Sequence, residues 1–337
     1  MAKHRRPTAR IVRRIVIALT AAAATLGALW WLFFALKPYT IHPEHLQARY
    51  AHATPDSQAG PVQLGPVEVV QVGGTTAWAQ SLSFRSFDGA LVLGRIVHPT
   101  DPADAAAAGA TPNQRRVMLA LHAMGRTQWR WWQGEFKGRP TIENTHRLAE
   151  RALQAGHVVL ALDARGHGDR KDPHQPLIAR KLLRDLHLWG QREPYERLIT
   201  DTVKDYRVLL DWVARQSGLD AARVRAAGYS MGAQMALLLA AVDSRVHSVA
   251  AMVPPHLDAK VAVVAPSTVV SRLAQVEVWL LTADDDEHAS LSESEALFVA
   301  LPSTAKRHLR FPGGHVLPAA YVDQLQSWIA TPPRRSP

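Results

Sequence analysis

A serine flanked by glycines stands where a short apolar segment meets an Ala- and Leu-rich one, in the sequence Gly228-Tyr229-Ser230-Met231-Gly232. Gly-x-Ser-x-Gly between a strand and a helix is the pattern of a nucleophile elbow, a sharp turn that lifts the serine hydroxyl out of a sheet. The backbone can bend this sharply only where Gly228 and Gly232 have no Cβ to clash. We therefore predict that Ser230 is a catalytic nucleophile.

A candidate base and several candidate acids follow Ser230 in the chain order that an elbow serine requires. A serine hydroxyl needs a base to remove its proton and an acid to orient that base. His315 lies in a Gly-Gly loop after the last predicted strand, and we interpret it as the general base. The residue types leave the acid open among four aspartates that follow predicted strands: Asp284, Asp285, Asp286 and Asp258.

The acidic residues do not point to a metal site. Asp284 to His288 are consecutive, and consecutive side chains converge on one ion only in a contorted loop. The chain has no cysteine, which excludes disulfides, thiolate metal sites and a cysteine nucleophile. We expect no metal and no organic cofactor.

The elements that must position these groups alternate between strands and helices, which is typical of an α/β domain. A hairpin of two strands with alternating apolar and polar residues is predicted at 77–84 and 91–97. Apolar runs predict further strands at 117–121, 157–162, 223–227, 246–253, 276–281 and 308–311. Helices are predicted at 141–155, 196–216, 231–242, 291–300 and 319–329. We expect a mostly parallel, doubly wound sheet of the eight-stranded type, with the N-terminal hairpin antiparallel, in a domain spanning 77–331. The loops after parallel strands meet at one edge of such a sheet, where the serine, base and acid would gather.

Positive charge is concentrated at the N-terminus. The formal net charge is +10, and six positive charges lie in the first fourteen residues: Lys3, Arg5, Arg6, Arg10, Arg13 and Arg14. The remaining charge of about +4 is ordinary for a solvated surface. We therefore expect no nucleic-acid partner.

Residues 15–36 form a stretch of 22 residues without a charge, long enough to cross a bilayer as one helix. A cleaved signal peptide is the alternative, because the alanines at 21–24 are small enough for signal peptidase. The apolar stretch continues through Trp30 and Trp31, however, which favours an uncleaved transmembrane signal anchor. By the positive-inside rule, residues 1–14 lie in the cytoplasm and the catalytic domain is extracytoplasmic, in the periplasm or outside the cell.

The remaining segments carry weaker signals. Residues 37–76 lack a sustained period and are predicted to be a linker with an edge strand at 67–72, and 101–114 is predicted to be a loop. The insertion at 170–195 has an apolar stripe compatible with a small cap helix over the site. Residues 332–337 are a tail.

Six segments, in this order, resemble the α/β-hydrolase superfamily, nearest to its dienelactone hydrolase and serine esterase branches. The resemblance extends over about residues 77–330. The matching segments are 83–89, 121–125, 163–168, 228–232, 284–286 and 314–315.

The resemblance implies roles that the residue types leave open. It assigns the acid to Asp286, with Asp285 as the alternative one position earlier. It also implies an oxyanion hole made by the backbone N–H groups of Met124 and Met231, which would stabilise the charge that develops on the substrate carbonyl oxygen. Ala123 stands where the family often has glycine. The loop at 163–168 is chiefly structural in the family.

We predict a serine hydrolase that cleaves carboxylic esters through an acyl-enzyme on Ser230, with a small-molecule ester as substrate. A serine peptidase of the same fold is one alternative. A non-catalytic hydrolase fold that serves as an anchored binding module is another. The sequence leaves the acyl and alcohol groups and the oligomeric state open.

Overall fold

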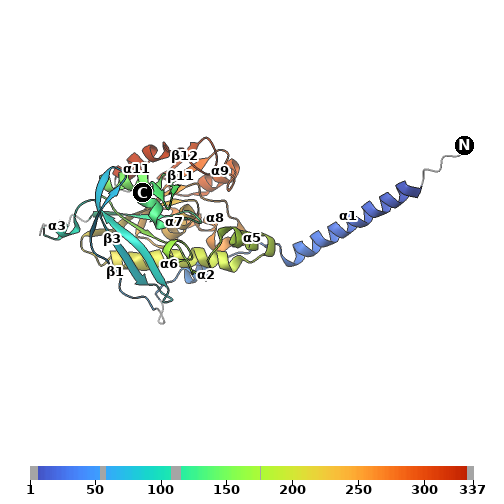
Figure 1. The fold of residues 1–337 in the computed structure, drawn as a ribbon, viewed down its shortest axis with the longest axis horizontal. Coiled ribbons are helices and arrows are strands. Elements are labelled where there is room, and N and C mark those ends of the chain that lie inside the picture. Colours follow the sequence, from blue (N-terminus) through green and yellow to red (C-terminus); the bar gives the residue numbers. More distant parts are fainter. Residues whose placement is uncertain (1–6, 54–57, 108–114, 175, 332–337) are drawn as a thin grey trace.

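The computed structural model describes residues 7–53, 58–107, 115–174 and 176–331. Lys3, Arg5 and Arg6 of the basic N-terminus and the tail at 332–337 lie outside the described residues. Strands and helices alternate along most of the described chain, and one long helix projects away from them (Figure 1).

Ten strands of the described residues form one sheet in the order β1-β3-β4-β8-β5-β9-β10-β11-β12, with β2 paired to β3. Neighbouring strands in the part β1-β3-β4-β8 of this order are antiparallel. Neighbouring strands in the part β8-β5-β9-β10-β11-β12 are parallel. The strands are β1 (Gln63–Leu64), β2 (Glu68–Val72), β3 (Thr75–Arg85), β4 (Leu91–His98), β5 (Arg115–Leu121), β8 (Val158–Leu162), β9 (Leu219–Tyr229), β10 (Val246–Met252), β11 (Glu277–Ala283) and β12 (Lys306–Phe311). The mostly parallel sheet and its antiparallel hairpin, β3 with β4, are confirmed.

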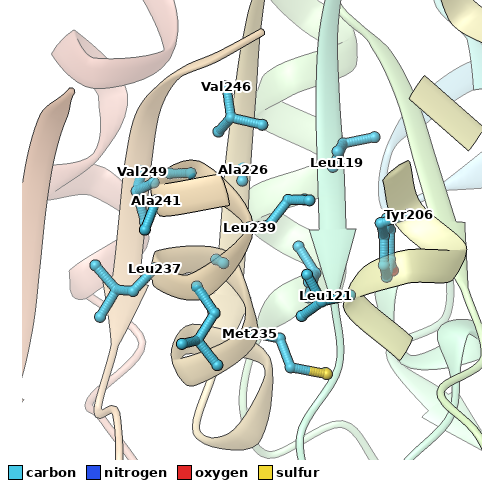
Figure 2. Packing of buried hydrophobic residues seen from close by; sticks show 14 of the residues in the cluster. Leu119, Leu121, Tyr206, Ala226, Met235, Leu237, Leu239, Ala241, Val246 and Val249 are labelled. Atoms are coloured by element: carbon cyan, nitrogen blue, oxygen red, sulfur yellow. The ribbon is translucent and has the colours of Figure 1, made fainter. Parts of the chain in front are cut away.

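Helices cover both faces of the sheet, as the doubly wound pattern requires. One buried apolar cluster contains residues of α6 (Arg192–Val213) and α7 (Met231–Val242), and the other contains residues of α4 (Thr145–Gln154), α10 (Tyr321–Gln324) and α11 (Gln326–Ala330). Figure 2 shows the first cluster, where leucines of α7 pack on β5, β9 and β10. The central strands are buried on both faces, which explains their unbroken apolar runs.

The segment at 37–76 contains more structure than the predicted linker. The edge strand predicted at 67–72 is present as β2, but α2 (Pro43–Arg49) and β1 are present too, and β1 and β2 bring the sheet to ten strands instead of the eight expected. Leu46 and Tyr50 are buried in the core, and the Tyr50 hydroxyl donates to the carbonyl oxygen of Val263 at 2.9 Å. These partners are distant in sequence, so the segment shows no local period.

Three other predicted elements differ in their bounds. The segment 101–114 begins with α3 (Pro102–Ala107), and residues 108–114 lie outside the described residues. Helix α4 begins at Thr145 instead of 141, after Asn144 in a left-handed conformation with φ 53°. The helix predicted at 319–329 is divided into α10 and α11 at Leu325.

Helix α1 (Pro7–Phe33) begins earlier and ends earlier than the predicted span of 15–36. An 18-residue window within Arg10–Phe33 has a mean hydropathy of 2.0, and none of its residues is buried. Among the described residues it is the one helix long and apolar enough to cross a membrane. The chain leaves the helix after Phe33 and turns towards the domain.

The insertion at 170–195 contains α5 (Ala179–Trp189), which packs against α6. Leu186 on the predicted apolar stripe is buried, whereas Leu188 and Trp189 are exposed. Trp189 lies edge-on against Phe34, with ring centroids 5.3 Å apart. Helix α5 therefore contacts the end of α1, and a role as a cap over the site stays a prediction.

Candidate active site

Ser230 occupies a strained turn between β9 and α7. Its φ of 55° and ψ of −117° are rare for a residue with a side chain. A Cβ on Gly228 would lie 2.0 Å from the carbonyl oxygen of Gly232, and a Cβ on Gly232 would lie 2.1 Å from that of Leu121. The Ser230 N–H donates to the Met252 carbonyl oxygen of β10 at 2.8 Å. The two glycines therefore permit the close approach that the elbow needs.

The structure brings Ser230, His315 and Asp286 into one hydrogen-bonded chain. His315 Nε2 lies 2.8 Å from Ser230 Oγ, and His315 Nδ1 lies 2.9 and 3.0 Å from the two carboxylate oxygens of Asp286. A carboxylate only accepts hydrogen bonds, which assigns the imidazole proton to Nδ1 and leaves Nε2 to accept from the serine hydroxyl. The three residues come from the ends of β9, β11 and β12.

Asp286 is held as a carboxylate. Burial acts to raise its pKa, but hydrogen bonds from His315 and from the His288 backbone N–H outweigh burial and lower the pKa below the usual aspartate value. Its side chain is only 2% exposed. The acid is therefore ionised and shielded where it faces the imidazole.

The other candidate aspartates bind elsewhere. Asp284 pairs with Arg310 at 3.0 Å and is exposed. Asp285 is exposed too, and its backbone N–H donates to the Gly313 carbonyl oxygen. Asp258 accepts from the Lys260 N–H at the start of a 3-10 helix. The geometry thus favours Asp286 as the partner of His315.

Residues that the sequence analysis did not identify hold the His315 loop in place. The Tyr229 hydroxyl donates to the His315 carbonyl oxygen at 2.9 Å and accepts from the Leu317 N–H at 2.8 Å. Glu287 accepts from the His315 N–H at 3.1 Å, and the His288 ring lies edge-on to the His315 ring at 4.5 Å. Tyr229 lies inside the serine motif, so its position next to Ser230 was the signal available.

The loop carrying Met124 is fixed by a buried neutral histidine. His122 Nε2 accepts from the Ala164 N–H at 2.9 Å, and its Nδ1 lies 2.8 Å from the Ala123 carbonyl oxygen. Burial lowers the pKa of His122 to about 4, so the ring is uncharged at neutral pH. Met231 begins α7, and the first N–H groups of a helix have no acceptor within it. Both N–H groups stay candidates for the oxyanion hole.

The loop at 163–168 makes structural bonds, as expected. Asp163 accepts from the N–H groups of Gln128 and Asp169 at 2.8 and 2.9 Å, and Arg165 pairs with Asp205 and Asp88. In the described part of the chain, no three His, Asp or Glu side chains converge as a metal ion would require.

The elbow geometry predicts different outcomes for two glycine substitutions. Gly232→Ala should lower the free energy of unfolding by about 3 kcal/mol, because its methyl group would overlap the Leu121 carbonyl oxygen. Gly218→Ala is the matched control, because no atom lies within 4 Å of the added Cβ. Chemical denaturation of both variants measures the difference. Equal stability of the two would contradict the close packing described here.

Comparison with known proteins bears on the fold. A family model described as alpha/beta hydrolase fold matches residues 135–329, which is more than half of the chain. A search of proteins with curated functions finds no match.

Several solved structures share the fold. Acetyl xylan esterase 1 from a Thermoanaerobacterium species is 17% identical, with a TM-score of 0.63, and the match covers 87% of this chain and 95% of that one. An acetyl xylan esterase from a Paenibacillus species is 16% identical, with a TM-score of 0.57, and the match covers 87% of this chain and 96% of that one. A cold-adapted esterase from an Arctic intertidal metagenomic library is 20% identical, with a TM-score of 0.52, and the match covers 78% of this chain and 97% of that one. With the sheet topology and the family match together, the chain belongs to the α/β-hydrolase fold family.

Proposed function

We propose that this protein is a serine hydrolase that cleaves carboxylic esters through an acyl-enzyme on Ser230. The observation that carries the proposal is the contact of His315 Nε2 with Ser230 Oγ at 2.8 Å, with Asp286 on the other ring nitrogen. The similar folds of several esterases support ester substrates.

The geometry suits the two halves of ester hydrolysis. Ser230 Oγ attacks the ester carbonyl carbon while His315 Nε2 takes its proton, and Asp286 stabilises the imidazolium that forms. In this proposal the backbone N–H groups of Met124 and Met231 donate to the oxyanion. Collapse of the tetrahedral intermediate expels the alcohol, which takes the proton from His315. Water, activated by His315, then releases the acid and restores Ser230.

The two alternatives are less well supported. A serine peptidase of this fold usually carries a propeller or a large lid domain, and the inserted segment at 170–195 is short. A non-catalytic binding module has no need for the aligned hydrogen bonds of Ser230, His315 and Asp286.

Replacement of the serine tests the proposal directly. Ser230→Ala should lose labelling by a fluorophosphonate probe and lower the hydrolysis of short para-nitrophenyl esters by at least about a thousandfold, because no nucleophile remains. Ser271→Ala, which alters an exposed serine, should keep both activities. If the unaltered protein is not labelled, or if folded Ser230→Ala is labelled equally, the proposal is wrong.

A second substitution tests the acid. Asp286→Asn should lower kcat by about ten-thousandfold, because an amide no longer selects the Nδ1–H tautomer of His315. The circular dichroism spectrum should stay the same, which would show that the variant is folded. Asp285→Asn is the matched control one position away and should change kcat less than about threefold, since Asp285 is exposed. Comparable losses in the two variants would reject Asp286 as the acid.

We also propose that α1 is an uncleaved membrane anchor for the catalytic domain that follows it. The end of α1 packs on the domain: Trp30 Nε1 donates to the Leu188 carbonyl oxygen at 2.8 Å, and Phe34 contacts Trp189. Arg192 donates to the Lys37 carbonyl oxygen at 3.0 Å. Contacts of this kind are expected of a segment that stays with the mature protein. In this proposal the N-terminus lies in the cytoplasm, because Arg10, Arg13 and Arg14 precede the span and positive charge favours the cytoplasmic side.

The absence of cysteine makes this topology easy to test. In intact cells, a membrane-impermeant maleimide should label Ser271→Cys on the domain and leave Ala2→Cys at the N-terminus unlabelled. The protein should also stay in the membrane after alkaline carbonate extraction, with residues before 21–24 detected by mass spectrometry. A mature N-terminus after this alanine run would show a cleaved signal peptide and contradict the anchor.

A further inference from the structure

A cavity of about 350 Å³ opens beside the loop that carries Met124. We call it the basic pocket, because five positively charged side chains and one carboxylate line it: Arg126, Arg130, Lys137, Arg139, Lys171 and Asp169. The steps of ester hydrolysis proposed above use none of these charges.

The basic pocket lies at the same edge of the sheet as Ser230. It is formed by the segments that follow β5 and β8, while Ser230 follows β9, and the three strands are parallel neighbours in the order β8-β5-β9. The carboxyl ends of parallel neighbours meet at one edge of a sheet. Gly125, which lines the pocket, directly follows Met124 in the chain. The pocket and Ser230 therefore lie at the same edge of the sheet, and the loop that carries Met124 borders the pocket.

A small hairpin presents two of the cations. Strands β6 (Glu135–Phe136) and β7 (Arg139–Pro140) pair with each other, and Lys137 occupies the turn with a left-handed φ of 52°. The Phe136 ring stacks on Trp129 at 6.1 Å, and Lys137 Nζ lies 5.2 Å from the Phe136 ring centroid. Arg130 Nη1 donates to the Arg139 carbonyl oxygen at 2.7 Å. These contacts hold the hairpin and its charges over the cavity.

The cations outnumber their partners. Arg126 pairs with the buried Glu143, but Lys137, Arg139 and Lys171 form no ion pair among the described residues. Burial lowers the pKa of the Arg130 guanidinium, and the neighbouring charges of Arg126 and Arg139 lower it further. Like charges that line one cavity repel one another, and a bound anion would offset that repulsion.

We infer that the basic pocket binds an anionic group, a carboxylate or a phosphate, carried by the ester substrate. This inference rests on the proposed esterase function and narrows its substrate class. The cavity has room for such a group, and guanidinium and ammonium groups bind carboxylate and phosphate oxygens through charge-assisted hydrogen bonds.

Pairs of esters that differ in one charge test this inference. Para-nitrophenyl hemisuccinate and para-nitrophenyl butyrate compare an anionic with a neutral acyl group. Para-acetoxybenzoate and its methyl ester make the same comparison on the alcohol side, and para-acetoxyphenyl phosphate replaces the carboxylate by a phosphate. At low ionic strength, we expect KM for the anionic member of at least one pair to be about tenfold lower than for the neutral member, since a charged hydrogen bond is lost with the charge.

Substitutions assign such a preference to the pocket. The double variant Lys137→Gln and Arg139→Gln should bring the two KM values of that pair to within about twofold of each other. Arg223→Gln removes a charge from the N-terminal half of β9, away from the end that leads into Ser230. This variant should retain the full preference. Thermal unfolding midpoints establish that both variants are folded.

The outcomes separate this inference from the proposed function. Hydrolysis of neutral esters with no preference for any anionic partner, or with a preference that the double variant keeps, overturns the inference alone. Failure to hydrolyse any of the esters overturns the proposed function, and the inference falls with it.

Discussion

Helix α7 begins so close to β5 that a methyl group on Gly232 would lie 2.1 Å from the Leu121 carbonyl oxygen. This close approach determines the conformation of Ser230, whose φ of 55° is tolerated because the surrounding strands and helix hold it there. The serine therefore has a fixed position, and the other groups of the site must be brought to it. Tyr229, on the same turn, does part of this by bonding to both sides of the His315 loop.

A buried charge network joins elements on the β3–β4 side of the sheet. Asp205 on α6 is fully buried, pairs with Arg165 and Arg170, and accepts from the Ser86 hydroxyl in the turn between β3 and β4. Loss of one partner from such a network typically costs about 3–5 kcal/mol, because the remaining charges stay buried. The network joins the hairpin, α6 and the loop after β8. That loop also supplies Gly168, Asp169 and Lys171 to the lining of the basic pocket, so the network anchors a segment that borders the proposed substrate site.

Two buried histidines near the candidate oxyanion loop differ from His315 in what their ring nitrogens bond to. Burial lowers the pKa values of His122 and His167 to about 4, and both rings bond to backbone groups around the candidate oxyanion loop. Both rings are therefore uncharged at neutral pH. His315 alone of these three bonds to a carboxylate through one ring nitrogen and to a serine through the other. That pairing, and not residue type, distinguishes a candidate base among 16 histidines.

Local patterns were enough to predict the parallel strands, the hairpin, α7 and the order of serine, acid and histidine, because periodicity and strand ends are properties of neighbouring residues. They could not choose between Asp284 and Asp286 without a family resemblance, since successive residues of a turn point in different directions and only the folded loop determines which one faces His315. They also missed the packing of Tyr50 on Val263, which are far apart in the chain. The basic pocket likewise exists only where loops after two separate strands meet. Contacts of this kind depend on the sheet that brings the loops together, and so the tertiary structure decided them.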